Sequence, residues 1–465
     1  MFNHSYLLYL IIFIKCSLFC ADTFAQGSET QLSDRYRFFR ADEQYLDATK
    51  QELTMSPVGE FKRIPLFNNS EHYLSIGGDY RHRYEYNSNQ AFGLRGDYST
   101  DAFNHRFMLH GDLNTPYMRT FIQLSANEQQ GNIEIPAPTS ESSIDFHQAF
   151  VDFSPSWGII RLGRQELNLG AGKKTGIREG PNQRRAFDGA RVKLSNVKGT
   201  DVDLFYLKEV QPQHEAFSDS STKGPKFYGA YANSIASLLN DVALDLFYFG
   251  YEKESSIYFQ GTKDETRHSL GVRLYKNNGA IQFDYEATYQ FGDFGSSDIS
   301  AWGLATETSY GLNDMTWKPR AGVRFNIASG DSDSTDGELG TYNALFPNPT
   351  YVSDAAIIHP GNEFDLQLFV KLHARENLSL FAGIDFLWRI ESQDALYGVP
   401  GVPLISASES SNNFAATFFN FNATYILNPY ISIQSGYVYA QAEDVIRHAK
   451  GENTNFMFFQ LALRF

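Results

Sequence analysis

Basic side chains recur in this sequence at a spacing of two residues, which places them on the same face of an extended strand. In "SIGGDYRHRYEY", residues 75–86, Arg81 and Arg83 share a face, and Arg191 and Lys193 repeat the spacing. A guanidinium group pairs bidentately with a carboxylate, and a surface of one charge sign concentrates ions of the other sign. These residues therefore predict the binding of anions along the faces of strands.

Strand parity extends this candidate binding set beyond the two pairs. Its ten members are Arg81, Arg83, Arg106, Arg119, Arg161, Arg191, Lys193, Arg320, Arg324 and Arg389. Arg267 and Arg273 fall on the same face, together with the acidic residues Asp79, Glu85, Asp112, Asp284, Glu286, Asp365 and Asp385. Ion pairs that only brace the wall would explain any single arginine equally well, so the sequence leaves both interpretations open.

Strands with one apolar and one polar face must position these residues. The clearest is "IQFDYEATYQF", residues 281–291. Its apolar face carries Ile281, Phe283, Tyr285, Ala287, Tyr289 and Phe291, and its polar face carries Gln282, Asp284, Glu286, Thr288 and Gln290. A water-soluble core does not need so polar an inner face, whereas a lipid-embedded barrel alternates in this way.

The number of such segments and the composition indicate the fold class. Scanning for alternating segments bounded by turn residues gives about 18 strands from Tyr73 to Phe465, an even number within the range of outer-membrane barrels. Aromatic residues are 15% and charged residues 20% of the chain. After the N-terminus no run of roughly 18 apolar residues occurs, which excludes a helical membrane protein. We therefore predict an all-β, transmembrane antiparallel β-barrel in the outer membrane of a Gram-negative bacterium.

The connections between the predicted strands alternate between long and short. Long segments at 88–100, 130–142, 168–185, 210–225, 253–265, 330–361 and 392–411 are each followed by a short turn such as "NTPY" or "ARE". Long extracellular loops and short periplasmic turns are typical of outer-membrane barrels, so both chain termini are expected in the periplasm. We also expect the loop at 167–187, with five basic residues, to fold toward the mouth of the pore.

The N-terminus predicts secretion. "YLLYLIIFI", residues 6–14, is a short apolar core, and the small residues around Ala25 predict a signal peptide of residues 1–25. Residues 26–71 then form a periplasmic lead-in and residues 72–465 the barrel. Both cysteines, Cys16 and Cys20, lie in the signal peptide, so the mature chain is expected to contain no thiol or disulfide.

The last eleven residues, "NFMFFQLALRF", have the pattern of a lipid-facing strand. Met457, Phe459, Leu461, Leu463 and Phe465 occupy alternate positions and end on an aromatic residue. This ending resembles the terminal signal that the barrel-assembly machinery reads, so we expect that machinery to bind the chain through Phe465.

Other chemistries find little support in the sequence. No G-x-S-x-G motif occurs, the histidines are scattered, and "GAGKKTG" lacks the glycine that precedes Lys-Thr in a Walker A loop. We expect neither an enzyme nor a nucleic-acid partner. Asp331, Asp333, Asp336 and Glu338 offer oxygen ligands for Ca²⁺, but their spacing differs from an EF-hand, so a solvated loop without a cofactor is favoured.

Several motifs resemble the alginate export family of outer-membrane porins. They are "FKRIPL" with "YLSIGGDYRHRYE" (61–85), "RLGRQELNLGAG" with "NQRRAFDGARV" (161–192), and the loop "ASGDSDSTDGELGTYNALFPNP" with "PGNEFD" after it. The resemblance runs from about Arg35 to the C-terminus and implies an 18-stranded monomeric barrel. Members of the family include the exporter of alginate, an anionic uronate polymer, through a pore lined with basic side chains.

The resemblance and the basic face together predict a channel for an anionic solute. An anionic polysaccharide such as alginate, moving outward through an arginine-lined lumen, is the favoured substrate. The alternative is a general or nutrient-uptake porin for small oligosaccharides or other small solutes, which would have the same fold and charge. Either channel would be surrounded by outer-membrane lipid and lipopolysaccharide.

Overall fold

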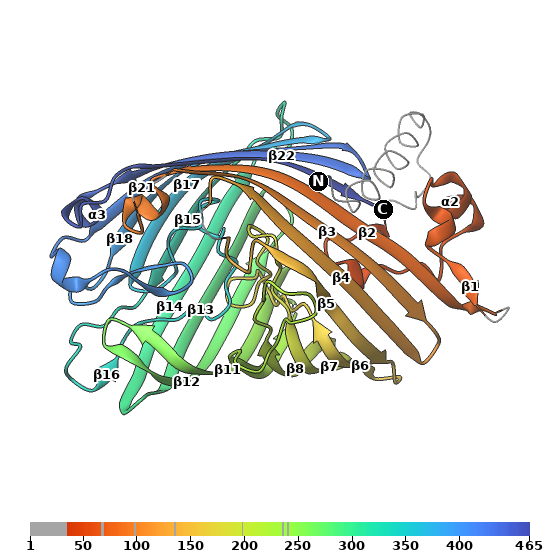
Figure 1. Ribbon diagram of the computed structural model, residues 1–465, viewed down its shortest axis with the longest axis horizontal. Helices are drawn as coiled ribbons and strands as arrows, with labels where there is room; N and C mark the ends of the chain where they lie inside the picture. The colour runs from red at the N-terminus through yellow and green to blue at the C-terminus, as the bar shows by residue number, and fades with distance from the viewer. Residues whose placement is uncertain are drawn as a thin grey trace.

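The computed structural model describes residues 35–465 except 67–68, 97–98, 134–135, 198, 235–236 and 240, so the predicted signal peptide lies outside the described residues. Within this part of the chain, eighteen long strands form one closed sheet (Figure 1). In chain order they are β2 (Asn69–Ser88), β3 (Thr100–Asn114), β4 (Met118–Gly131), β5 (Ser142–Phe153), β6 (Gly158–Gln165), β7 (Phe187–Val197), β8 (Thr200–Glu209), β9 (Lys226–Asn233), β11 (Val242–Tyr258), β12 (Gly261–Lys276), β13 (Ile281–Phe294), β14 (Ser297–Gly311), β15 (Arg320–Ala328), β17 (Glu363–Arg375), β18 (Leu378–Arg389), β21 (Phe414–Asn428), β22 (Ile431–Ala442) and β23 (Thr454–Arg464).

The barrel closes where the first long strand meets the last. Strands β2 and β23 pair antiparallel from Asp79 opposite Arg464 to Ser88 opposite Asn455. Each other neighbouring pair among the eighteen is also antiparallel, as a chain that folds up and down around the ring requires. The predicted strand number and barrel fold are confirmed. The helices of the described residues are all too short to cross a bilayer.

The two faces of the sheet differ as the alternation predicts. On β13, Tyr289 is 50% exposed on the outer face, whereas its neighbour Gln290 is fully buried on the inner face. Leu270 on β12 and Trp302 on β14 are also exposed on the outside, beside Tyr289 in the sheet register. The outer apolar band fits lipid, and the inner face holds the polar residues.

Long connections gather at one end of the barrel, called the loop end, and short turns at the other, called the turn end. The loops used below are L1 (89–96), L3 (166–186), L7 (329–362), L8 (390–413) and L9 (443–453). Shorter elements lie within or beside them: β16 (Glu338–Leu339) in L7, β19 (Leu396–Gly398) and β20 (Val402–Ile405) in L8, and α3 (Asp444–His448) in L9. β10 (Ser237–Leu239) precedes β11 at the turn end.

The expectation of a long loop at 253–265 is wrong. Strands β11 and β12 continue through this stretch and meet at a two-residue turn, Phe259–Gln260, with Tyr258 opposite Gly261. Strands β13 and β14 meet in the same way, through Gly295 and Ser296. The charged residues at 253–265 belong to strands that extend past the apolar band, where both faces can be polar, so charge did not mark a loop there.

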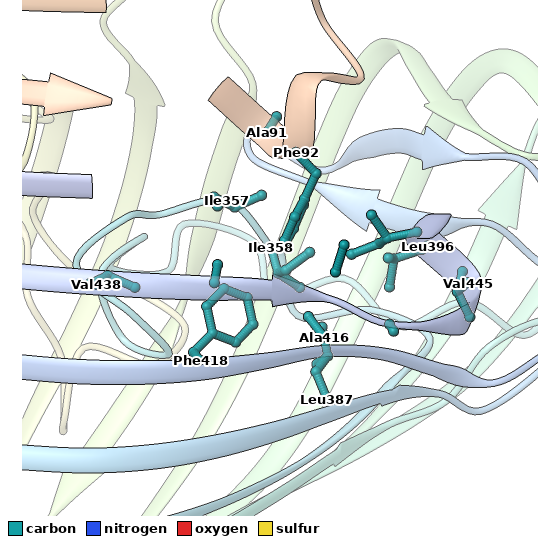
Figure 2. Close-up of a cluster of buried hydrophobic side chains, with 14 of the residues drawn as sticks. Ala91, Phe92, Ile357, Ile358, Leu387, Leu396, Ala416, Phe418, Val438 and Val445 are labelled. Carbon is teal, nitrogen blue, oxygen red and sulfur yellow. The ribbon is translucent and has the colours of Figure 1, made fainter. Parts of the chain in front are cut away.

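Four loops pack together at the loop end and form an apolar core inside the mouth of the barrel (Figure 2). Phe92 of L1, Ile358 of L7, Leu396 of L8 and Val445 of L9 meet, each 3% exposed or less. Inward side chains of the wall, Phe418 among them, complete the cluster. Burial of this much apolar surface holds the loops in place on the β18–β23 side.

The described part of the predicted lead-in begins inside the barrel. Ala41 packs against Phe121 of β4 and Phe150 of β5, whose side chains point inward. The chain then leaves through α2 (Lys50–Met55), which lies outside the turn end, and returns through β1 (Ile64–Leu66), which pairs with β2.

The outer band makes a test of the membrane orientation possible. Replacing Leu270 by lysine should lower the free energy of unfolding in a lipid bilayer by about 2–4 kcal/mol, the cost of a lysine facing the hydrocarbon near its midplane. Phe217→Lys, at a 58% exposed position in the connection after β8, is the matched control and should change it little. Denaturant titration of the protein in phospholipid vesicles measures both. Equal effects of the two substitutions would contradict the assigned lipid face.

Candidate functional site

Loop L3 crosses the lumen, and one of its anchors is an arginine cluster on β2 and β3. Arg106 of β3 donates to Glu179 at 2.7 Å, and Arg184 of L3 donates to the same carboxylate at 2.5 Å. Arg81 of β2 donates to the backbone oxygens of Glu179, Gly180 and Pro181. This side of L3 is therefore fixed by guanidinium groups that the sequence had assigned to anion binding.

The other anchor of L3 lies on strands β12 and β13. The Lys173 ammonium is 3.0 Å from Asp284 and the Lys174 ammonium is 3.0 Å from Glu286, both on β13. Arg273 of β12 shares Asp284 at 2.5 Å. Because β2 and β3 lie far around the ring from β12 and β13, L3 spans the interior between two walls.

Loop L7 also turns inward, and it interlocks with L3 through the backbone. The N–H of Phe346 donates to the backbone oxygen of Lys174 at 2.9 Å, and the backbone oxygen of Phe346 accepts from the N–H of Gly176 at 2.8 Å. Arg185 ties the two loops further by donating to the backbone oxygens of Gly176 and Phe346. The 167–187 loop, which was expected to fold toward the mouth of the pore, lies inside the barrel, and L7 accompanies it.

The ring of Phe346 explains why the inner wall is apolar near the crossing. It packs among inward aromatic residues of β7 to β11, including Phe187, Phe227 and Tyr251, at ring-centroid distances of 5.1 to 5.6 Å. Sequence parity identifies these wall residues as inward, but it cannot reveal the loop residue that covers them.

Most of the ten predicted site residues face the interior in contact with an acidic group. Arg119 and Arg161 bind Asp112 and Asp152 through two nitrogens each, at 2.7 and 2.8 Å. The remaining acid pairs are Arg83 with Glu85 at 2.6 Å, Arg106 with Glu179 at 2.7 Å, Arg191 with Asp203 at 2.6 Å and Arg324 with Glu307 at 2.9 Å. Their charges are largely neutralised in place, because an unpaired buried charge is costly.

The four other predicted residues form no close acid pair, although the Arg81 guanidinium lies 3.8 Å from the Glu179 carboxylate. Arg389 is almost fully buried and donates to backbone oxygens of L8, as Arg81 does to those of L3. Lys193 is exposed at the turn end of β7. Arg320 donates to the backbone oxygens of Gly279 and Ala280. Within the described residues, neither Lys193 nor Arg320 forms an ion pair.

A recess of about 520 Å³ opens in the inner wall between β12 and β17 at the turn end. Its basic lining residues are Arg273, Lys276, Lys318, Arg320 and Lys371, and its acidic ones are Asp284 and Glu307. Each acid is already shared by two cations: Asp284 by Arg273 and Lys173, and Glu307 by Arg324 and Lys371. Lys276, Lys318 and Arg320 form no ion pair with any residue that the structure describes, so this basic recess carries an excess of positive charge.

Sequence reasoning missed Lys276 and Lys318 as site residues. Lys276 is the last residue of β12 and lies three residues after Arg273, so strand parity does not place it on the same face, and Lys318 stands in the turn before β15, where parity does not apply. A signal for them was available in the turn sequences, since "KNNG" and "TWKPR" place a lysine beside the polar face of the strands that they connect.

The acidic residues of L7 accept hydrogen bonds from within the loop and from a neighbouring turn. Asp333 accepts from Thr335, Asp336 accepts from the N–H of Glu338, and Asp331 accepts from Gln260. Across the described ranges, no group of three or more His, Cys, Asp or Glu side chains is arranged to hold a metal ion. The expectation of a solvated loop without a cofactor stays a prediction.

Comparison with known proteins gives a family and a fold. The family model described as "Alginate export" matches residues 72–460. No curated protein matches the chain in sequence.

Solved structures resemble the chain at low sequence identity. Pseudomonas aeruginosa OccD3 (OpdP) has a TM-score of 0.57 at 12% identity, over 87% of this chain and 93% of that one. Acinetobacter baumannii OccAB1 has a TM-score of 0.56 at 13% identity, over 84% and 96%. P. aeruginosa OccK11 (OpdR) has a TM-score of 0.54 at 11% identity, over 84% and 96%. At these identities the likeness supports the barrel fold alone.

Glu179 is the residue on which the β2–β3 anchor of L3 depends. Burial alone would raise its pKa, but the charges of Arg106, Arg184 and Arg81 outweigh burial and hold the pKa well below the ordinary glutamate value of 4.5. The resulting stabilisation is fully present above pH 4.5 and is lost only as the pH falls through the depressed folded pKa. Protection of L3 should therefore be the same at pH 7 and pH 5.

Glu179→Gln should release L3 from this wall, since removal of one partner of a buried ion pair costs about 3–5 kcal/mol. Hydrogen-exchange mass spectrometry of the protein in vesicles should show faster exchange in residues 170–182. Glu215→Gln, at an exposed position in the connection after β8, is the control and should leave L3 protected. Unchanged exchange in the Glu179 variant would contradict the anchor.

Proposed function

The chain belongs to the alginate export family, whose model covers residues 72–460, and on that premise we propose that it is an outer-membrane channel for anionic solutes. The observation that carries the proposal is the basic recess. Five cations line it and only two carboxylates, each of which already binds two cations. An anion that enters the turn end therefore finds unpaired positive charge on the wall.

The narrowness of the interior gives this charge its effect. In a wide water-filled pore, salt screens wall charges beyond a Debye length of about 8 Å at physiological ionic strength. Here L3 crosses the lumen between its two anchors and L7 is bonded to it, so in this proposal a solute passes close to the wall that the loops leave open. A lining of one charge sign then favours ions of the opposite sign.

The substrate class follows from guanidinium and ammonium chemistry. Carboxylates are bound by arginine in a bidentate manner and by lysine as a point charge, so sugar acids and other small carboxylates fit the recess. Family membership favours an anionic polysaccharide such as alginate, threaded as a single uronate chain and exported. The interlocked loops L3 and L7 favour the alternative, uptake of short oligosaccharides or other small anions.

Transport rather than catalysis is the proposed role. The paired arginines of the wall belong to the framework of the channel in this proposal, and the residues that meet the solute are Arg320, Lys276 and Lys318. Arg191 and Arg161 of the candidate binding set thereby belong to the framework in this proposal, because Asp203 and Asp152 bind them.

Arg320→Glu should lower the anion-to-cation permeability ratio by roughly twofold or more in planar bilayers, because it reverses an unpaired charge in a narrow passage. The effect should be larger in dilute salt than in 1 M salt, where the Debye length shrinks to about 3 Å. Reversal potentials in a salt gradient provide the measurement. Arg375→Glu, at the exposed last position of β17 outside the recess, should leave the ratio unchanged.

Blockade of single-channel current then separates the two substrate classes. If the channel threads a polymer, long uronate oligomers should block the wild-type current, whereas uronate monomers should pass. Neutral maltooligosaccharides are the control. An unchanged reversal potential in Arg320→Glu would remove the recess from the permeation path and overturn the proposal.

A further inference from the structure

Residues 36–45, called the N-terminal insert, occupy the lumen at the turn end against the wall of β2 to β5. Ala41 covers Phe121 and Phe150, whose inward side chains are 0% and 2% exposed. On the outer face of the same strands Ile122 and Phe153 are 43% exposed, as expected for lipid contact. The insert therefore shields two aromatic residues that would otherwise face water inside the channel.

Buried polar contacts fix the insert in one position. Arg40 donates to the backbone oxygen of Phe465 at 2.6 Å and pairs with Glu43 at 3.0 Å. The Tyr45 hydroxyl donates to Glu43 at 2.7 Å. Buried charges that are paired and hydrogen-bonded in this way specify one arrangement and resist sliding of the segment along the wall.

A second fixing point is Lys62, which follows the insert after α2. Its ammonium donates to the backbone oxygen of Ile76 at 3.0 Å and lies 5.3 and 5.5 Å from the ring centroids of Tyr36 and Tyr45. Two ends of the insert are thus held by one buried cation. Burial, with a smaller contribution from Arg40, lowers the pKa of Lys62 to about 7.

The insert also reaches the loop that crosses the lumen. The guanidinium of Arg184, which holds Glu179 within L3, lies 4.6 Å from the ring centroid of Phe38. Phe38 is 50% exposed, so half of its surface is left uncovered by Arg184 and its other neighbours. The insert and L3 together form a continuous partition that starts at the turn end.

The insert stands opposite the basic recess, whereas L3 reaches the recess wall through the contact of Lys173 with Asp284. Going around the ring from β5 to β12, five strands intervene (β6, β7, β8, β9 and β11), and from β17 to β2 four strands intervene (β18, β21, β22 and β23). The wall that the insert covers and the wall that carries the recess are therefore diametrically opposed. One side of the turn-end mouth is filled, and the other side is left open and basic.

We propose that the N-terminal insert is a selectivity element of the channel: it narrows the turn-end mouth and confines solutes to the basic wall between β12 and β17. The confinement to a basic wall rests on the proposed function, whereas the narrowing does not. Phe38 borders the passage in this arrangement, and Ala41 keeps the insert seated on β4 and β5.

Thiol modification at position 38 tests the narrowing without disturbing the fold. Phe38→Cys, reconstituted in planar bilayers, is treated with a charged methanethiosulfonate reagent added to the turn-end side. The current should fall by about half or more, because a bulky group is attached beside a narrow passage. Met55→Cys, 68% exposed in α2 outside the barrel, is the matched control and should react without a change in current. If modification at position 38 left the current unchanged, the insert would not border the passage.

Ala41→Asp tests the confinement. A carboxylate forced between Phe121 and Phe150 should unseat the insert, raise the single-channel conductance by about twofold and lower the anion-to-cation permeability ratio, because solutes gain a path away from the basic wall. In the double variant Phe38→Cys/Ala41→Asp, thiol reactivity at position 38 reports whether the insert has left the wall. If the insert has left the wall and the conductance is unchanged, the proposal is overturned. If the wild-type channel proved unselective while modification at Phe38→Cys still blocked it, the insert would stand and the proposed anion function would fail.

Discussion

Hydrocarbon offers no hydrogen-bond partner to a peptide group, and this constraint determines the rest of the structure. A sheet in lipid has to close on itself, and here β2 meets β23 with ten residue pairs in register from Asp79 and Arg464 onward. Eighteen strands closed into a ring surround an interior that is too wide for the side chains of the wall alone to fill. The chain fills that space with its own loops and with its N-terminal insert, and the chemistry of the interior follows from the way it does so.

Filling a polar interior with protein has an electrostatic consequence. Once L3 and L7 displace water, the arginines of the wall lose hydration and need a charge partner or several backbone oxygens in exchange. Arg161 with Asp152 and Arg191 with Asp203 take the first course, Arg389 takes the second, and Arg81 combines backbone oxygens with the carboxylate of Glu179. In the basic recess Lys318 stays exposed and Lys276 half-buried, and neither has an acidic partner among the described residues. The basic residues that stabilise the wall and those proposed to bind the solute thus lie on the same face of the sheet. They differ in whether other parts of the chain cover them.

Local patterning predicted the barrel well because a lipid-facing strand repeats every two residues, and the alternation of Tyr289 with Gln290 follows directly from it. The same rule placed Arg106 and Arg324 inside the barrel. The rule could not predict which residues bind the inward charges, because the partners are distant in the sequence. Glu179 follows Arg106 by 73 residues, and Asp284 follows Lys173 by 111 residues. The misassigned loop at 253–265 shows the opposite limit: beyond the membrane a strand needs no apolar face, so polarity no longer separates strand from loop.

The bond between Arg40 and Phe465 joins residues 425 positions apart, and it links the seating of the insert to the completion of the barrel. Phe465 is held in place only when β23 has paired with β2, where the Phe465 N–H donates to the backbone oxygen of Gly78 at 3.0 Å. The insert is synthesised first but cannot be locked until the last strand is in register. The fold therefore requires an order of assembly. A barrel whose last strand was missing or out of register would lack the acceptor for Arg40, and the insert would not be fixed against β2–β5. Contacts of such sequence separation form late in folding, so the seated insert marks a channel that has finished closing.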